Sequence, residues 1–353
     1  MVKEEVMQMR MEMVDPTADP DWDRTVLSYP CANTFHSAAW SRVLSETYGH
    51  RPFYLRFIEA QRIIALVPLM EVQSLLRPRR GISLPFSDFC DSLVVGQNYN
   101  EELFHQIGRL AAQQGWSYMD LKGTGSVPLE AIPSVSFYSH RLDLRGGYEA
   151  VSRGFRPSVR QALRKAEGGH LTVEIEHSEE AMREFFHLHV LTRRRHGLPP
   201  QSLAFFLNIH QEIIARNMGF IVRVRSRGHT ISAMVFFHWG KIAIYKFGAS
   251  DKSFQNLRPN NLAMATGIEA LADEYHADYL HFGRSSLSNA GLRRFKLTWG
   301  AEEEMLHYYR YDLLRHQWEK ARDRTEGFHT KLFRHFPPQL SRLAGTLIYA
   351  HLD

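Results

Sequence analysis

The chain has 353 residues, 44% of them hydrophobic and 23% charged, which is the balance of a folded protein rather than of a disordered one. Its length exceeds what one hydrophobic core usually organises, so two domains are expected. The 43 Lys and Arg residues against 38 Asp and Glu give a formal charge of +5. This mild excess favours anionic partners such as phosphate-bearing cofactors, RNA or an anionic membrane surface, but falls short of a dedicated nucleic-acid-binding composition.

Cysteine content and apolar runs bear on location. Cys31 and Cys90 are far apart, so neither a disulfide framework nor a cysteine zinc site is expected. Residues 1–23 are interrupted by charges and lack the apolar core of a signal peptide. The most apolar late stretch, residues 343–352, is about half the length of a membrane span. We therefore expect a cytoplasmic protein with at most peripheral membrane contact.

The first half opens with a predicted helix over residues 37–48, whose apolar residues recur at helical spacing before Gly49 ends it. Two apolar runs around the polar residues 59–62 then predict a hairpin. The further elements follow in chain order: strands over 51–58, 63–72 and 82–89, a helix over 101–114, and strands over 116–121 and 135–144.

The second half repeats this element order after a break at residues 145–147. Its predicted elements are helices over 180–195 and 203–217, a hairpin of strands 220–225 and 230–239 with its turn at 226–229, a strand over 242–249, a helix from 259 to about 275, and strands over 279–282 and 304–311. Because the halves share order but not sequence, we predict an architectural duplication. A chance match of coarse element strings is the alternative.

These patterns predict an α/β protein with mixed α+β sheets. We expect one unit over residues 1–145, a similar second unit over 146–312, and a helical tail over 313–353. The tail carries an apolar stripe that needs a cover, and packing back onto the first unit is favoured over membrane contact.

Residues 156–166 predict a basic helix. Pro157 suits a first helical turn, and Arg156, Arg160 and Arg164 recur every fourth residue on one face. No acid is interleaved before Glu167, so these like charges repel unless an anion neutralises them, and guanidinium groups suit phosphate. A solvated basic face is the alternative.

A segment rich in glycine and hydroxyl groups, residues 283–300, follows the predicted strand over 279–282. Such a loop places backbone N–H groups and small side chains, including Ser285, at the carboxyl edge of a sheet, where ligands of open α/β sheets commonly bind. Arg284 and Lys296 are candidates to pair with substrate carboxylate or phosphate oxygens. A surface cation is the simpler interpretation of either residue alone.

Residues 250–261 lead from a predicted strand into a predicted helix near Asn260. A helix N-terminus offers N–H donors to a pyrophosphate, although a helix capped by Asn explains the segment equally well.

Asp88 and Asp91 lie three apart beside a predicted strand end, where Asp88 is a candidate general base and a simple turn is the default. His187 and His189 point apart on a helix, and no third ligand is evident, so no metal site is predicted. Nothing resembles a nucleophile elbow, so a hydrolase triad has no positive support.

Motifs in both halves together carry a family resemblance. They are Phe35-His-Ser-Ala-Ala-Trp40, Tyr48-Gly49, Leu66-Val-Pro-Leu69 and Pro85-Phe-Ser-Asp88 in the first half, and residues 160–166, Thr192-Arg-Arg-Arg-His-Gly197, residues 245–250, Pro259-Asn260, Phe282-Gly-Arg-Ser285 and Phe295-Lys296 with Trp299-Gly-Ala301 in the second. In order and spacing, over about residues 25–312, the chain resembles the FemAB-like branch of the GNAT superfamily.

The resemblance implies two tandem GNAT-like domains and transfer of an acyl or aminoacyl group to an amine. Peptidoglycan-branching relatives take amino acids from aminoacyl-tRNA and add them to a cell-wall precursor, whereas other relatives are described as acetyltransferases. The helical arm of some tRNA-using relatives has no counterpart here, and the acetyl-CoA fingerprint is absent from residues 250–261. The donor, acyl-CoA or aminoacyl-tRNA, therefore stays open as a co-substrate, and no tightly bound cofactor is expected.

The expected reaction is direct attack of a substrate amine on a bound thioester or ester. By similarity, Lys296 matches a lysine that serves substrate or transition-state charge, and Arg284 would assist it. Asp88 or Tyr245 would take up the proton. The residues expected to hold substrate or phosphate are Arg156, Arg160, Arg164, Ser285 and Asn260.

The expected partners are a small-molecule or cell-envelope precursor and charged tRNA, not DNA. Two alternatives remain: an acetyl-CoA-dependent N-acetyltransferase of a small-molecule amine, and a non-catalytic protein that binds RNA or an anionic glycan through the arginine stripe.

Overall fold

The structure, a computed structural model, describes residues 9–74, 77–96, 99–320, 338–349 and 351. The first half contains β1 (Arg10–Val14), α1 (Trp22–Leu27), η1 (Thr34–His36), α2 (Ala38–Tyr48), β2 (Arg51–Pro52), β3 (Tyr54–Glu59), β4 (Arg62–Val67), β5 (Met70–Ser74), β6 (Arg77–Ile82), β7 (Leu93–Val94), α3 (Asn100–Gln113), β8 (Tyr118–Lys122) and β9 (Val135–Asp143).

The second half begins with α4 (Gly147–Arg153), α5 (Pro157–Glu167), β10 (Thr172–Glu176), α6 (Glu179–Arg195), α7 (Leu203–Ile209) and the π-helical turn η2 (His210–Ile214). It continues with β11 (Gly219–Ser226), β12 (His229–Trp239), β13 (Ile242–Ser250), η3 (Lys252–Leu257), α8 (Pro259–Glu269), the π-helical turn η4 (Ala270–Glu274), β14 (Tyr279–Ser286), α9 (Ala290–Leu297), β15 (Glu302–Asp312) and β16 (Gln317–Glu319). The last described helix is α11 (Pro338–Tyr349).

Local sequence explains where these helices begin and end. The Ser37 side chain accepts a hydrogen bond from the Trp40 backbone at the start of α2, and Gly49 ends that helix in the left-handed conformation. Ser178 and Ser202 cap α6 and α7 in the same way. The predicted starts of these three helices are confirmed to within one residue. The predicted helix over 203–217 is shorter than expected, because α7 ends at Ile209 and the π-helical turn η2 continues it only to Ile214.

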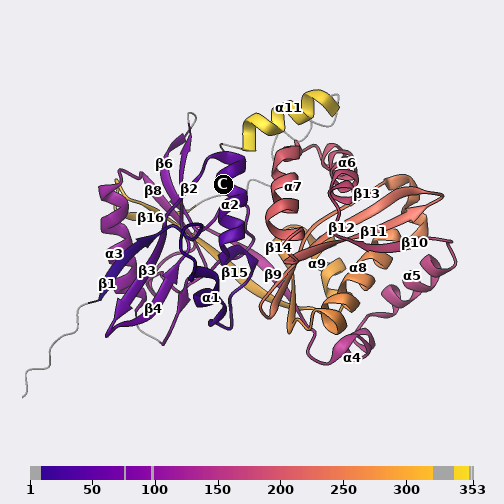
Figure 1. Cartoon of the computed structure of the whole chain (residues 1–353), viewed down its shortest axis with the longest axis horizontal. Coiled ribbons are helices and arrows are strands. Elements are labelled where there is room, and N and C mark those ends of the chain that lie inside the picture. The colour runs from indigo at the N-terminus through magenta and orange to yellow at the C-terminus, as the bar shows by residue number, and fades with distance from the viewer. Residues whose placement is uncertain (1–8, 75–76, 97–98, 321–337, 350, 352–353) are drawn as a thin grey trace, which may run out of the picture.

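One mixed sheet runs through both lobes of the molecule (Figure 1). Among the described residues it has 12 strands, in the order β10-β11-β12-β13-β14-β9-β15-β8-β6-β5-β2, with β16 beside β15. A separate four-stranded sheet, β1-β3-β4-β7, covers the first half. The predicted α/β class with mixed sheets is confirmed.

The two halves exchange strands where they meet. β9, from the first half, lies between β14 and β15, while β15, from the second half, lies between β9 and β8. The neighbours of these strands are thus set by the other half of the chain. The division of the chain into two units at residue 145 stays a prediction.

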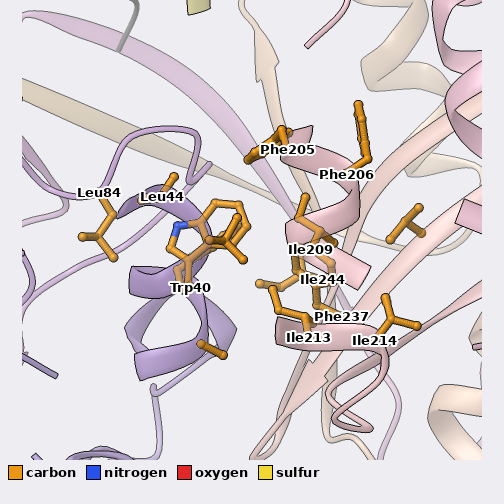
Figure 2. Packing of buried hydrophobic residues seen from close by; sticks show 14 of the residues in the cluster. Trp40, Leu44, Leu84, Phe205, Phe206, Ile209, Ile213, Ile214, Phe237 and Ile244 are labelled. Atoms are coloured by element: carbon orange, nitrogen blue, oxygen red, sulfur yellow. The ribbon is translucent and has the colours of Figure 1, made fainter. Parts of the chain in front are cut away.

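A shared hydrophobic cluster also joins the halves. Trp40 of α2 is fully buried and packs against Phe205 of α7 and Phe237 of β12, with ring centroids 6.2 and 6.0 Å away (Figure 2). Burial of a large aromatic ring removes much apolar area from water. This contact therefore helps to fix the position of one half against the other.

The tail is described only in part, since residues 321–337, 350 and 352–353 lie outside the described residues. Helix α11 contacts α6 of the second half, where the Arg342 guanidinium lies 4.9 Å from the ring centroid of Phe186. At its end, Tyr349 lies 6.0 Å from Phe86, and His351 bonds to Ser74. The described tail thus contacts both halves, and packing on the first half is found at its C-terminal end.

Two predicted segments are corrected. Residues 83–89 are not a strand, because β6 ends at Ile82 and both Leu84 and Phe86 adopt positive φ. The predicted loop over residues 283–300 is replaced by the end of β14 and by helix α9, which Asn289 caps. In both places a buried lysine side chain donates hydrogen bonds to backbone carbonyl oxygens.

Candidate functional site

The candidate site lies where two parallel strands separate. β13 and β14 pair at Ile242↔Tyr279, Ala243↔Leu280 and Ile244↔His281, after which β13 continues to Ser250 and β14 to Ser286 without further pairing. On its other edge β14 pairs with β9 along its whole length, with an irregularity between His281 and Arg284. Beyond Ile244 and His281, the facing edges of the two strands are therefore not hydrogen-bonded to each other.

Gly283 occupies this irregularity and has a φ of +69°. A Cβ atom at this position would lie 3.2 Å from the Asp88 Oδ2 atom. The lack of a side chain at Gly283 therefore allows both the backbone conformation and the close approach of Asp88.

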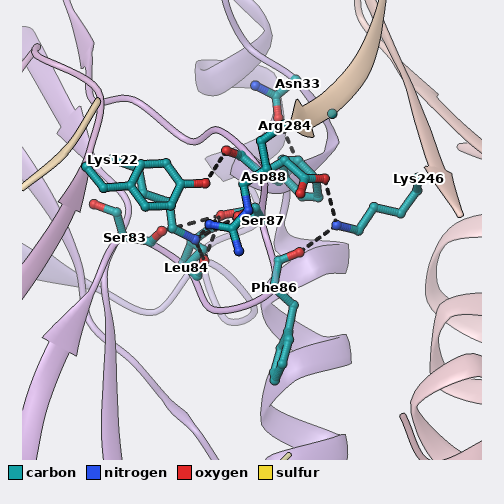
Figure 3. A network of polar contacts seen from close by, with 12 residues as sticks. Asn33, Ser83, Leu84, Phe86, Ser87, Asp88, Lys122, Lys246 and Arg284 are labelled. Carbon is teal, nitrogen blue, oxygen red and sulfur yellow. Dashed lines mark hydrogen bonds and ion pairs between the residues drawn. The ribbon is translucent and has the colours of Figure 1, made fainter. Parts of the chain in front are cut away.

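Asp88 is carried by the loop that follows β6. Its Oδ2 atom lies 3.1 Å from the Lys246 Nζ atom, and the same ammonium donates to the Phe86 carbonyl oxygen at 2.6 Å (Figure 3). The Tyr308 hydroxyl donates to the Asp88 backbone carbonyl. Asp88, in the first half, is thus fixed by contacts from the second half of the chain.

Lys246, on β13, is a site residue that sequence reasoning missed. Its side chain is only 5% exposed, and its ammonium lies 5.0, 5.9 and 5.2 Å from the ring centroids of Phe35, Trp40 and Phe247. Burial lowers its pKa, and Asp88 opposes that shift. A lone lysine inside an apolar strand was the signal, because such a charge needs a specific partner.

Lys296, the sequence-predicted lysine, is buried on α9 and only 2% exposed. Its Nζ atom donates to the carbonyl oxygens of Gly283 at 2.7 Å and Arg284 at 3.2 Å. These bonds use two of the three N–H donors of the ammonium. Burial lowers the pKa of Lys296 to about 8, while the negative charge of Asp88 opposes the shift.

Arg284 lies beside Asp88 and over two aromatic rings, 4.4 Å from the Phe137 centroid and 5.2 Å from that of Tyr308. Burial raises the pKa of Asp88, but nearby cations outweigh burial and the net pKa is lowered. Those cations are Lys246, Arg284 and Lys296. The structure therefore brings together the predicted Asp88, Arg284 and Lys296.

A further lysine, Lys122 at the end of β8, faces the same group. It donates to the Leu84 and Ser87 carbonyl oxygens, both at 2.7 Å, and to the Ser87 Oγ atom at 3.0 Å. Burial, followed by the charge of Arg284, lowers its pKa to about 7. The Asp88 cluster, defined as Asp88 with Lys122, Lys246, Arg284 and Lys296, thus sets one carboxylate among four basic groups, an arrangement that favours a negatively charged or developing oxyanion.

Tyr245 lies apart from this cluster. It neighbours Lys246 on β13 and so points to the opposite face, where it packs 5.5 Å from Phe236 and 6.4 Å from Phe282. Burial raises its pKa, so its hydroxyl stays protonated at neutral pH.

Ser285 and Asn260 have different surroundings. Ser285 is buried, and its Oγ atom has no hydrogen-bond partner among the described residues. The Asn260 side chain donates to Ser250 Oγ at 3.2 Å and accepts from Ser232 Oγ at 2.8 Å. Its amide group therefore ties the start of α8 to β12 and β13.

The arginine stripe of α5, defined as Arg156, Arg160 and Arg164, is exposed, while Val159 and Ala166 on the other face are buried. The Arg156 backbone N–H donates to the Thr298 carbonyl at 2.9 Å. Helix α5 thus begins beside the end of α9, the helix that carries Lys296, and it lies at the outer side of the second half (Figure 1).

Two further properties concern the described residues. No group of three or more His, Cys, Asp or Glu side chains is placed to hold a metal ion within them. None of the helices described has the length and apolar character needed to cross a membrane.

The chain is similar to several known proteins. Residues 153–297 match the family model described as Acetyltransferase (GNAT) domain. The structure of FemX resembles this chain with a TM-score of 0.66 and 14% identity, and the match covers 85% of this chain and 96% of that one. No curated protein matches the chain by sequence.

Two other solved structures resemble it. A tandem GNAT protein from the clavulanic acid biosynthesis pathway has a TM-score of 0.55 and 10% identity, covering 87% of this chain and 99% of that one. The structure of L-PGS from Bacillus licheniformis has a TM-score of 0.51 and 14% identity, with 93% and 97% covered.

The fold resembles that of a tandem GNAT protein, and the Asp88 cluster lies where the two halves of the chain meet. The match over residues 153–297 assigns this segment to a GNAT acetyltransferase domain, and the predicted resemblance to FemAB-like proteins agrees with the likeness in fold to FemX.

Proposed function

We propose that the protein transfers an acyl or aminoacyl group from an activated donor to an amine at the separation of β13 and β14. The observation that carries this proposal is the Asp88 cluster, which places basic groups and a carboxylate at that separation. An extended, amide-bearing donor suits the strand edge beyond Ile244, because such an edge can pair with another chain.

The reaction requires a neutral amine to attack the donor carbonyl. A C–N bond forms as the nitrogen lone pair adds to the carbonyl carbon, and the carbonyl oxygen takes up negative charge. Collapse of this intermediate breaks the C–S or C–O bond of the donor, and the amine proton passes by way of a base to the departing thiolate or alkoxide. The site must therefore stabilise an oxyanion and move one proton.

Lys296 and Arg284 are assigned to the oxyanion. The Lys296 ammonium has a third N–H donor beyond those bonded to Gly283 and Arg284. Because Lys296 is held by backbone carbonyl oxygens of β14 itself, its position is set before the donor binds. Preorganisation of this kind reduces the cost of stabilising developing charge.

Asp88 is the better candidate for the proton acceptor. It lies 3.2 Å from the position that a side chain at Gly283 would occupy, whereas Tyr245 faces the other side of β13. The lowered pKa of Asp88 keeps the carboxylate ionised and makes it a weak base. Its main contribution is therefore to bind and orient the amine and to hold the proton only briefly.

The arginine stripe of α5 is assigned to phosphate groups of the donor. Both acyl-CoA and aminoacyl-tRNA carry phosphates, and guanidinium groups bind phosphate oxygens well. Its Arg156 end is hydrogen-bonded to Thr298, two residues after Lys296. Ser285, with its unpartnered Oγ, is a further candidate for a substrate contact, and Asn260 contributes by ordering the start of α8.

The acceptor is proposed to be a small-molecule or cell-envelope-precursor amine. A test combines the purified protein with acetyl-CoA or with a set of charged tRNAs and with a panel of amines, and follows the new amide by mass spectrometry. Product with acetyl-CoA alone supports the acetyltransferase alternative, and product with charged tRNA alone supports aminoacyl transfer. Absence of product with every donor contradicts the proposed function for the substrates tested.

The binding-protein alternative rests on the exposed arginine stripe. The variant Arg156→Ala/Arg160→Ala/Arg164→Ala is compared with a matched control, Arg24→Ala/Arg62→Ala/Arg109→Ala, which removes three exposed arginines elsewhere. Salt-sensitive RNA binding that is lost only in the first variant, with no transfer, would favour the alternative.

A further inference from the structure

Within the described residues, each half contains one parallel strand pair that separates after three residue pairs. In the second half this pair is β13 with β14. In the first half it is β6 with β8, paired at Arg80↔Tyr118, Gly81↔Met119 and Ile82↔Asp120. One further hydrogen bond, from Ser83 N–H to the Asp120 carbonyl, ends the first-half ladder. The two separations are therefore equivalent in position.

Aligning the two ladders makes Lys122 the counterpart of Gly283. Two residues after the last paired position of β8, Asp120, comes Lys122, and two residues after the last paired position of β14, His281, comes Gly283. The halves therefore differ at one equivalent point: the second half has no side chain there, and the first half has a lysine.

The Lys122 ammonium closes the first-half separation. Its three N–H donors meet three oxygens, two backbone carbonyls and the Ser87 hydroxyl, at 2.7 to 3.0 Å. Lys122 is 8% exposed. An ammonium group with every donor used is a cross-link within the fold and not a free nucleophile.

The loop that Lys122 holds has a strained path. Leu84 and Phe86 have φ values of 47° and 59°, which residues other than glycine rarely adopt and which need outside contacts to persist. Lys122 supplies such contacts to Leu84 and Ser87. The next residue after Ser87 is Asp88.

We propose that Lys122 is a positioning residue, whose ammonium closes the first-half strand separation and holds residues 84–88 so that Asp88 and the Phe86 carbonyl meet Lys246. The importance of this position for transfer rests on the proposed function, whereas the closure itself does not. Of the two strand separations, that of β6 and β8 is closed by the Lys122 side chain, whereas that of β13 and β14 has Gly283, without a side chain, at the equivalent position.

The cross-link needs a protonated amine, so the loop is sensitive to pH. The groups that face Lys122 are Asp88 and Cys90 from the loop, Lys246 from β13, Arg284 from β14 and Tyr308 from β15. Burial and the charge of Arg284 place its pKa near 7. Loss of the proton removes one donated bond from the loop but leaves the rest of the fold intact.

The test is amide hydrogen exchange of the full chain between pH 6 and 9, corrected for the intrinsic rate at each pH. In the wild type, protection of residues 83–89 relative to β3 and β4 should fall as pH rises through the titration of Lys122, which lysine-labelled NMR follows directly. In Lys122→Met, exchange of this loop at pH 6 should rise by at least about tenfold, with no pH dependence. Lys241→Met, at an exposed lysine, should match the wild type.

Two results would overturn the proposal. Unchanged loop protection in Lys122→Met would show that Lys122 does not hold the loop. An equal loss of protection in β3 and β4 would show that Lys122 stabilises the whole fold and not this loop in particular. Transfer activity is read separately. If the wild-type protein transfers nothing and Lys122→Met still loosens the loop, the proposed function fails and the role of Lys122 stands. If Lys122→Met has normal transfer and a normally protected loop, the role of Lys122 fails and the proposed function stands.

Discussion

The Asp88 carboxylate and the Lys246 ammonium form an ion pair of 3.1 Å between residues that are 158 positions apart in the chain. The Lys246 side chain is 5% exposed and that of Asp88 is 23% exposed. A pair of this kind ties the loop after β6 to β13 of the other half. It also sets a carboxylate beside the separation of β13 and β14.

The first prediction concerns this pair. Asp88→Asn should destabilise the fold by about 2 kcal/mol, because a buried ammonium loses its counter-ion, with the cost reduced by the partial exposure of Asp88. Urea unfolding measures the change. Adding Lys246→Met to Asp88→Asn should recover part of the loss, because no unpaired charge then remains. Strictly additive effects of the two substitutions would show that the residues are not energetically coupled.

The second prediction concerns Lys296. Lys296→Met should lower the transfer rate by about 100-fold or more while the protein stays folded, because the variant keeps the apolar stem but loses the donor to the oxyanion. Rates are measured with whichever donor proves active, and thermal unfolding confirms the fold. Lys241→Met, at an exposed lysine near the start of β13, serves as the control. A Lys296→Met enzyme with the wild-type rate would remove Lys296 from the reaction.

The third prediction concerns Gly283. Gly283→Ala should cost more stability than Gly228→Ala, although both glycines have positive φ, at +69° and +81°. A Cβ at Gly228 meets nothing within 4 Å, whereas one at Gly283 meets the Asp88 carboxylate at 3.2 Å. Gly228→Ala should therefore report the cost of the backbone conformation alone, about 1 kcal/mol. Equal costs in the two variants would mean that Asp88 yields freely to a side chain at Gly283.

The fourth prediction concerns acid sensitivity. Burial lowers the pKa of His36 to about 4 from its usual 6.5, against hydrogen bonds with Asp91 and Asn33 that oppose the shift. The unfolded chain then binds more protons than the folded chain between about pH 4 and 6.5, so stability is complete above this window and falls as pH drops through it, by about 1.4 kcal/mol per pKa unit.

His36→Gln should flatten this pH dependence, measured as the urea midpoint from pH 7 to 4.5. The exposed His229 provides the control, and His229→Gln should keep the wild-type slope. An unchanged slope in His36→Gln would mean that His36 is already charged in the folded protein at these pH values.

Much of the fold was predictable from the sequence because its signals are local. The spacing of apolar residues and Gly49 predicted α2, and the polar residues between two apolar runs predicted the hairpin of β3 and β4. The same holds for the hairpin of β11 and β12, which turns at Arg227 and Gly228. In each case the information lies within a few residues of the element it determines.

The site was predictable in part. Asp88, Arg284 and Lys296 were named from motifs, and the structure brings them together. Lys246 and Lys122 were missed because a single lysine in or after an apolar strand indicates that a partner is needed but not which groups supply it. Their importance lies in what surrounds them, namely aromatic rings for Lys246 and backbone oxygens for Lys122.

The sequence by itself predicted helices α2, α3 and α6, the hairpins and the basic face of α5, because short-range periodicity and turn chemistry encode them. Only the tertiary structure decided that β9 and β15 exchange sides and that residues 83–89 bend around an ammonium instead of forming a strand. A strand pattern shows which face is buried but not which strand will be its neighbour. Likewise, the burial of a charge becomes favourable only when partners from distant parts of the chain arrive together.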